Sequence, residues 1–219
     1  MKPTTLFLLS LLVFMAACKN PKPDLSGMKD GADTTKNDTS HRMSDAPPAT
    51  MADSATMMKA WMDFATPGDM HKWMSQYDGT WTGEVKSFMN PGQPPVISTA
   101  TVTSKMAMNG LYQLTDYSGT MMGQPFMGHG ILAYDNAKKH FVNTWIDNLG
   151  SGIVIMHGNW DEGAKTLRLK GTQTDPVTGK DSGIREDIMF PDNNTQTITM
   201  YGDMGGQEMK FMEATFKRK

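Results

Sequence analysis

The stretch GQPFMGHGILAYDNAKKHFVNTWID, residues 123–147, predicts a β-hairpin that decides the fold. Two runs rich in aromatic and branched side chains, 126–134 and 141–146, flank the segment Asp135-Asn136-Ala137-Lys138. Short polar side chains favour a tight turn because they hydrogen-bond to nearby backbone groups. We therefore expect two neighbouring antiparallel strands here.

Similar segments fill the chain from Gly79 to the C-terminus. The first alternates Trp81, Gly83 and Val85 with polar residues, and this period of two is typical of a half-buried strand. About ten strands are expected, the first from Gly79 and the others at 96–106, 111–117, 126–134, 140–146, 153–160, 166–172, 182–190, 195–201 and 208–216.

The connections between these segments are too short to hold crossover helices, so successive strands must pair antiparallel. An open meander has two exposed edges, and closure into a barrel removes both. The sequence therefore predicts an all-β fold, an antiparallel up-and-down barrel over residues 79–219, with one or two short helices in residues 50–78.

The first 17 residues have the features of a bacterial signal peptide. Lys2 precedes an apolar run, 6–17, that is too short to cross a bilayer as a mature helix. Met15-Ala16-Ala17-Cys18 resembles the lipobox of bacterial lipoproteins, with methionine in place of the usual aliphatic residue. We expect lipidation of Cys18, which would anchor the protein to a membrane. The alternative is an ordinary secretory signal.

A lipidated Cys18 places the protein in the cell envelope. Lys19 stands where an aspartate resembles the inner-membrane retention signal of some Gram-negative lipoproteins, so the outer membrane is expected. Cys18 is the only cysteine, which leaves the mature chain no thiol for a disulfide or a thiolate metal site. The formal charge of −2 predicts no nucleic-acid partner.

Residues 18–49 predict a disordered tether. They are rich in lysine, proline, aspartate, serine and threonine, and their isolated apolar residues cannot offset the entropy of ordering the chain. The folded part is expected to begin after this segment.

Two short helices are expected between the tether and the first strand. Apolar residues in 50–65 follow helical spacing, with Asp53 or Ser54 as the N-cap. The second helix is expected to have Thr66 as its cap and Pro67 at its first position.

Several motifs from the second helix onward point together to one family. They are His71, Gly79-Thr80-Trp81-Thr82-Gly83, Asn109-Gly110-Leu111-Tyr112, residues 123–130, Tyr134-Asp135, Trp145-Ile146-Asp147 and residues 175–180. The series resembles the bacterial domain-of-unknown-function family 1579, from about Met70 to the end. The resemblance implies a lipocalin-like β-barrel, frequently in exported proteins, and it implies no activity.

A small barrel of this kind either is filled by side chains or holds one small ligand. By alternation we expect one set of side chains to point inward: Trp81, Val85, Leu167, Leu169, Ile184, Ile188 and Phe190. The candidates for ligand contact are Trp81, Tyr112, Tyr117, Phe126, His129, Trp145, His157, Arg185 and Tyr201. A register change of one residue reverses their direction. Arg185 and Glu186 are neighbours, so only one of them can enter the barrel.

The histidines do not form a metal-binding motif. His41, His71, His129, His140 and His157 are scattered, which predicts no metal site and no cofactor, with haem bound through one histidine as the alternative. The 22 methionines are spread through all parts of the chain. We interpret them as adaptable packing residues rather than as Cu(I) ligands.

The leading hypothesis is a lipid-anchored envelope protein whose barrel binds a small apolar or amphipathic molecule. No catalytic residue is assigned. One alternative is an isomerase or hydrolase that works through His129 or His157, paired with a carboxylate such as Asp147 or Glu186. The other is a filled barrel that acts as an interaction module. The sequence leaves the oligomeric state open.

Overall fold

The computed structural model describes residues 53–90, 92–121, 123–203 and 206–219. The predicted signal peptide, Cys18 and the predicted tether lie outside these residues. The described elements are α1 (Ser54–Ala65), α2 (Asp69–Ser75), β1 (Gly79–Ser87), β2 (Val96–Ala107), the 3-10 turn η1 (Met108–Gly110), β3 (Tyr112–Met121), β4 (Gln124–Asp135), β5 (His140–Asp147), β6 (Val154–Asp161), β7 (Thr166–Thr174), β8 (Asp181–Asp192), β9 (Thr195–Asp203) and β10 (Glu208–Arg218).

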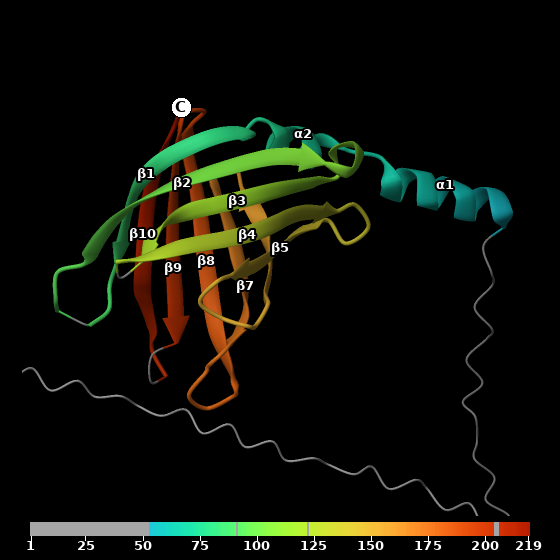
Figure 1. The fold of residues 1–219 in the computed structure, drawn as a ribbon. Coiled ribbons are helices and arrows are strands. Elements are labelled where there is room, and N and C mark those ends of the chain that lie inside the picture. Colours follow the sequence, from blue (N-terminus) through green and yellow to red (C-terminus); the bar gives the residue numbers. More distant parts are fainter. Residues whose placement is uncertain (1–52, 91, 122, 204–205) are drawn as a thin grey trace, which may run out of the picture. The chain divides into compact units, whose positions relative to one another are not determined.

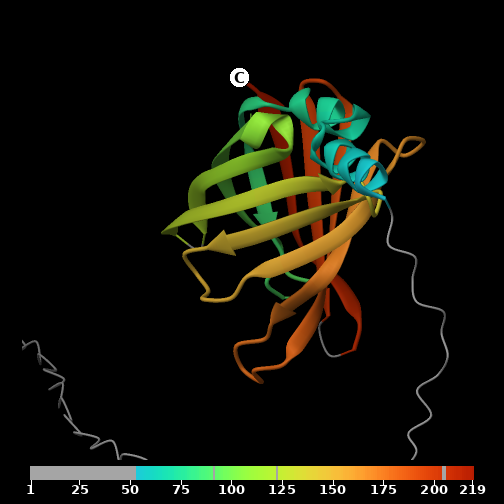
Figure 2. The ribbon, with the colours of Figure 1, turned by 90° about the vertical axis from the view of Figure 1, so that its right-hand side faces the viewer.

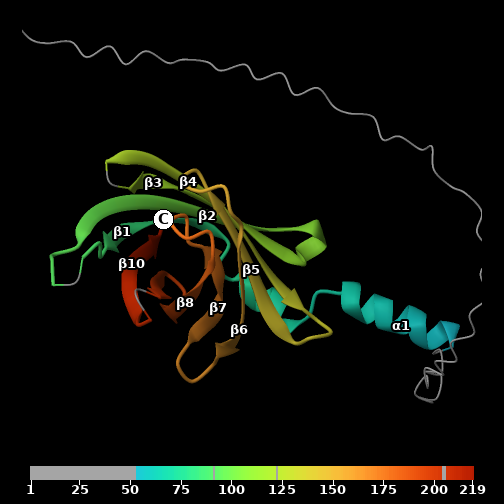
Figure 3. The ribbon, with the colours of Figure 1, turned by 90° about the horizontal axis from the view of Figure 1, so that it is seen from below.

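The ten strands form a closed antiparallel barrel (Figure 1). Each strand pairs with its neighbours in sequence, and the ring closes where β1 pairs with β10, with Gly83 opposite Phe216 and Val85 opposite Ala214. Seen from below, the strands form a ring (Figure 3). The predicted all-β barrel and its strand order are confirmed. The fold is complete within the compact unit Thr50–Lys219, which contains both closing strands.

The hairpin predicted from the opening stretch is formed by β4 and β5, with Asp135 opposite His140 at the turn. The Asp135 carboxylate accepts hydrogen bonds from the backbone N–H groups of Ala137 and Lys138, at 2.8 and 2.9 Å. These hydrogen bonds also lower the Asp135 pKa. Lys139 takes a positive φ of 57° to complete the turn. The turn therefore depends on the short carboxylate that the sequence places at its start.

The first helix begins as expected, but the second does not. Asp53 caps α1, its carboxylate accepting the N–H groups of Ala55 and Thr56 at 3.0 Å each. The prediction of Thr66 as the cap of the second helix is wrong, because the Thr66 hydroxyl donates to the Met62 carbonyl, 2.6 Å away, at the end of α1. The N-cap of α2 is Gly68, whose N–H donates to Nδ1 of His71.

Helix α2 covers one end of the barrel, as Figure 2 shows. Its Met74 and His71 are 0% and 2% exposed. Trp73 packs against Phe141, Trp160 and Phe190, with ring centroids 5.4, 4.6 and 5.6 Å apart. We call this end, where α2 packs, the covered end. In the part of the chain that the structure describes, neither helix has the length and hydrophobicity needed to cross a membrane.

Arg218 links the last strand to the segment between α2 and β1. Its guanidinium donates to the carbonyls of Asp78 and Gln76 and lies over the Trp81 ring, 4.2 Å from the centroid. The Trp81 indole N–H donates to the Tyr77 carbonyl. Trp81 is fully buried, so its apolar area and this cation–π contact both hold the covered end together.

Gly158 of β6 lies where the backbone of β7 approaches closely. A Cβ at this position would be 1.7 Å from the Arg168 carbonyl oxygen, whereas a Cβ on Gly183 of β8 would meet nothing within 4 Å. We expect Gly158→Ala to lower the free energy of unfolding by about 2–4 kcal/mol and Gly183→Ala to change it by less than about 0.5 kcal/mol. Urea unfolding followed by circular dichroism measures both, and equal effects of the two substitutions would contradict the close approach.

Candidate functional site

The barrel encloses a cavity of about 340 Å³. Side chains from all ten strands and from α2 line it, and most are apolar. Val85, Leu167, Ile184, Ile188 and Phe190, which the alternation places inward, are among them. The barrel is therefore hollow rather than filled, which answers the question that the sequence left open.

One wall of the cavity is aromatic and comes from three consecutive strands. Tyr117 of β3, Phe126 of β4 and Trp145 of β5 all line the cavity. The Tyr117 ring is 5.3 Å from the Phe126 ring and 6.1 Å from the Trp145 ring, both edge to face. Burial raises the pKa of the Tyr117 phenol to about 12, so the group is neutral at physiological pH. This wall offers a large, uncharged aromatic surface.

Two glycines in β4 make room for the Trp145 indole. A Cβ on Gly128 would lie 2.1 Å from the ring, and Gly130 pairs directly with Trp145 across the strands. The indole N–H donates to Oδ2 of Asp147, 2.9 Å away. The glycines around His129 in the opening stretch therefore serve the packing of a cavity residue on the next strand.

Glu186 of β8 is the most deeply buried acid on the cavity wall. The residue is 8% exposed, and its Oε2 accepts a hydrogen bond from the Asn143 side chain, 3.1 Å away on β5. Burial raises the Glu186 pKa to about 7, against the lowering effect of the Asn143 hydrogen bond, and the nearby charge of Asp187 raises it further. The carboxyl can therefore exist in both protonation states near neutral pH.

Of the pair Arg185 and Glu186, Glu186 enters the barrel. Arg185 lies on the outer face, where its guanidinium donates to both carboxylate oxygens of Glu208 at 3.0 and 2.8 Å and also to Asp187. Its Cζ is 3.7 Å from the centre of the Tyr201 ring, which pairs with Arg185 across β8 and β9. Arg185 and Tyr201 therefore form an outer-surface cluster.

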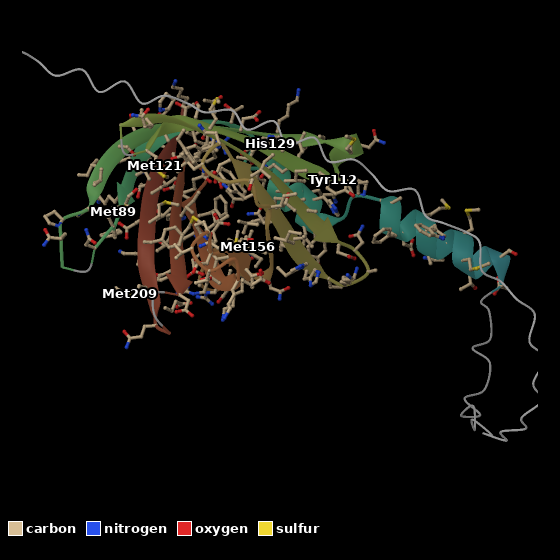
Figure 4. The ribbon with its side chains drawn as sticks, turned by 60° about the horizontal axis from the view of Figure 1, so that its bottom comes forward. Met89, Tyr112, Met121, His129, Met156 and Met209 are labelled. Carbon is tan, nitrogen blue, oxygen red and sulfur yellow. The ribbon has the colours of Figure 1, made fainter. Side chains whose placement is uncertain are left out.

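Only part of the predicted ligand-contact set lines the cavity. Tyr117, Phe126 and Trp145 do, whereas Trp81 packs in the core beneath Arg218. Five predicted residues do not line it and lie on the outer side of the wall: Tyr112, His129, His157, Arg185 and Tyr201. In Figure 4 Met156 lies within the barrel, whereas Tyr112 and His129 lie on its wall. The physical reason is the strand period of two, because each of the five is an odd number of residues from an inward neighbour on its strand.

The outer histidines have their own neighbours. Nδ1 of His129 lies 2.9 Å from Oδ1 of Asp116 on β3, at an exposed position. The rings of His140 and His157 are 5.2 Å apart. No histidine in the described part of the chain lines the cavity, so the residues present do not fit a haem ligated by histidine there. Among the described residues, no three histidine, cysteine, aspartate or glutamate side chains are grouped to hold a metal ion.

Sequence reasoning left Asn143 out of the ligand-contact set and chose Arg185 in place of its neighbour Glu186. Both could have been found by extending the alternation from residues already placed inward. Glu186 lies between Ile184 and Ile188, and Asn143 lies two residues before Trp145. The signal for both is a polar residue that lies an even number of residues from apolar side chains that point into the barrel.

A family model described as "Protein of unknown function (DUF1579)" matches residues 66–218. The chain belongs to the DUF1579 family. No curated protein matches its sequence at a significant level.

Solved structures with the same fold have little sequence in common with this DUF1579 protein. The crystal structure of Rv2717c from M. tuberculosis has a TM-score of 0.55 and 13% identity, with 70% of this chain and 99% of that chain covered. The S-type phycobiliprotein lyase CPES from Guillardia theta has a TM-score of 0.51 and 9% identity, with 73% and 96% covered. At these identities the likeness supports the fold alone.

The Glu186 pKa predicts a pH dependence of stability. An acid whose pKa rises from the ordinary value of 4.5 to about 7 on folding binds its proton more tightly in the native state. Its contribution to the free energy of unfolding therefore falls as pH rises from about 4.5 to about 7, by up to about 3 kcal/mol.

Glu186→Gln should abolish this component and make the variant more stable than the parent above about pH 7. Urea unfolding of both proteins at about pH 5 and about pH 8 isolates the effect, because every other titrating group is shared. A stability difference that stays constant between the two pH values would contradict the assignment.

Proposed function

We propose that this DUF1579 protein binds a small apolar or amphipathic molecule inside its barrel. The observation that carries the proposal is the apolar cavity of about 340 Å³. Protein sites for small molecules are commonly clefts or cavities of about 300–1,000 Å³, with apolar and aromatic walls and a few polar groups that set orientation. Tyr117, Phe126 and Trp145 supply the aromatic area, and Glu186 and Asn143 supply polar atoms.

The ligand enters at the end of the barrel opposite α2. Met121 and Leu149 line the cavity where β3 ends and where β5 connects to β6, and Leu149 is 53% exposed. Ile153 and Val177, on the connections at this same end, are 65% and 92% exposed. Exposed apolar side chains around an opening favour the approach of an apolar molecule.

The proposed setting is the cell envelope, with the protein held to the outer membrane by lipid chains on Cys18. The support comes from the sequence: the apolar leader, the lipobox-like Met15-Ala16-Ala17-Cys18 and Lys19 after the cysteine. The composition of residues 18–49 supports a tether that would let the barrel work away from the lipid surface.

The alternative functions have less support than ligand binding. A barrel enzyme that uses His129 or His157 needs one of these rings inside, and both lie on the outer side of the wall. A filled interaction module has no cavity. The positions of the two histidines therefore do not favour an enzyme, and the cavity volume does not favour a filled module.

Two neighbouring substitutions test the proposal. Val154 lines the cavity, whereas Ile155 is 48% exposed on the other side of β6. Val154→Phe should fill part of the cavity and reduce the amount of bound small molecule about tenfold or more, whereas Ile155→Phe should leave it unchanged.

The measurement is mass spectrometry of organic extracts from the parent and both variants, purified from the native host in equal amounts. Circular dichroism confirms that the variants are folded. The proposal fails if the parent carries no small molecule and takes up none from a host lipid extract, or if Val154→Phe carries as much as the parent.

A further inference from the structure

Among the described residues, the cavity is lined by acidic side chains and by no basic ones. Among the described residues that line it, the ionisable side chains are Glu186, Asp147, Tyr117 and Tyr77, and none is lysine, arginine or histidine. The nearest arginine in sequence, Arg185, is turned outward and engaged by Glu208 and Asp187. The cavity therefore presents carboxyl groups to its contents and no compensating cation.

The carboxyl groups of Asp147 and Glu186 differ in the number of hydrogen bonds that they accept. Asp147 accepts the Trp145 indole N–H through Oδ2 and the Leu149 backbone N–H through Oδ1, each at 2.9 Å. Glu186 accepts one hydrogen bond, from Asn143 to Oε2. A buried carboxylate with a single neutral donor is costly unless a cation or further donors reach it.

The strands beside Glu186 cannot supply that partner. Leu169 of β7 and Met200 of β9 lie directly opposite Glu186 in the two ladders, so their side chains share its face. Both are apolar, and Leu169 is fully buried. A positive group can therefore meet Glu186 only from inside the cavity.

We propose that the ligand is a cationic amphiphile, an apolar chain or ring system that carries a protonated amine, and that the ammonium group pairs with Glu186 while the apolar body lies against the aromatic wall. This inference rests on the proposed function and specifies its ligand class. An ammonium donates to the carboxylate and neutralises it, and the attraction is strong because water is largely excluded. A fatty-acid anion of the same length would instead face two acids without a counter-charge.

The protonation state of Glu186 supports the proposal. Burial raises its pKa, and a bound ammonium would lower that pKa. The charged or titratable groups near Glu186 are Asp187 beside it on β8, which pairs with Arg185 on the outside, and Asp147, Tyr117 and Tyr77 on the cavity wall. Amine binding should therefore weaken as pH falls below about 7, because Glu186 takes up a proton.

The test compares three probes of one chain length: n-decylamine, n-decanol and n-decanoate. The protein is the chain from Lys19 to Lys219, which contains the whole folded unit, stripped of bound lipid by organic extraction or refolding. Binding is followed at about pH 8, below the micelle concentrations, by calorimetry and by the total tryptophan fluorescence, to which Trp145 on the cavity wall contributes. Glu186→Gln is compared with Glu84→Gln, which removes the same charge from an exposed position on β1.

We expect the parent to bind decylamine at least about tenfold more tightly than decanol, and decanoate most weakly. Glu186→Gln should lower decylamine affinity about tenfold or more, leave decanol within about twofold and improve decanoate, whereas Glu84→Gln should change none of them. For the parent, decylamine affinity should also fall about fivefold or more between about pH 8 and about pH 5.5.

The outcomes separate the two proposals. If none of the three probes and no host lipid binds, the proposed function itself fails. If decanol or decanoate binds as tightly as decylamine, or if Glu186→Gln leaves decylamine affinity unchanged, the protein remains a binder of apolar molecules and the cationic ligand class is overturned.

Discussion

The pairing of β1 with β10 is the constraint on which the rest of the structure depends. Strand edges expose unpaired N–H and C=O groups, and the ring satisfies them by joining the first strand to the last. Closure also gives every strand a definite inside, so the period of two decides which side chains meet water and which meet the cavity. Arg218, next to the C-terminus, reinforces the joint by its contacts with Trp81 and with the carbonyls before β1.

The interior is divided along the barrel axis. Near α2 it is packed, with Met74, Trp73 and Phe141 in contact, whereas further along it opens between the aromatic wall and Glu186. The space is maintained partly by what β4 lacks, since Gly128 and Gly130 leave room for an indole that would otherwise be displaced. Burying Glu186 in such surroundings works against stability, a cost that is common where a protein prepares a binding site.

Much of the fold could be predicted from the sequence, because it depends on local signals that repeat. Turn residues such as Asp135 and alternating runs such as the one through Trp81 give strand number, order and pairing without knowledge of distant contacts. The site was harder. Tyr117, Phe126 and Trp145 were placed on the cavity, but His129 and His157 were chosen for their chemistry, and an error of one residue in phase puts a side chain on the opposite face. The cap of α2 was missed because the Thr66 hydroxyl is used by the preceding helix, which helix-start rules do not consider.

The contacts of Asn136 hold the end of α1 at one end of the barrel. Its side-chain amide, on the β4–β5 turn, donates to the carbonyls of Asp63, Phe64 and Thr66 and so fastens the last turn of α1 to the barrel at the covered end. Loss of the Asn136 amide would therefore loosen α1 without touching the strands around the opening, which lie at the other end of the barrel.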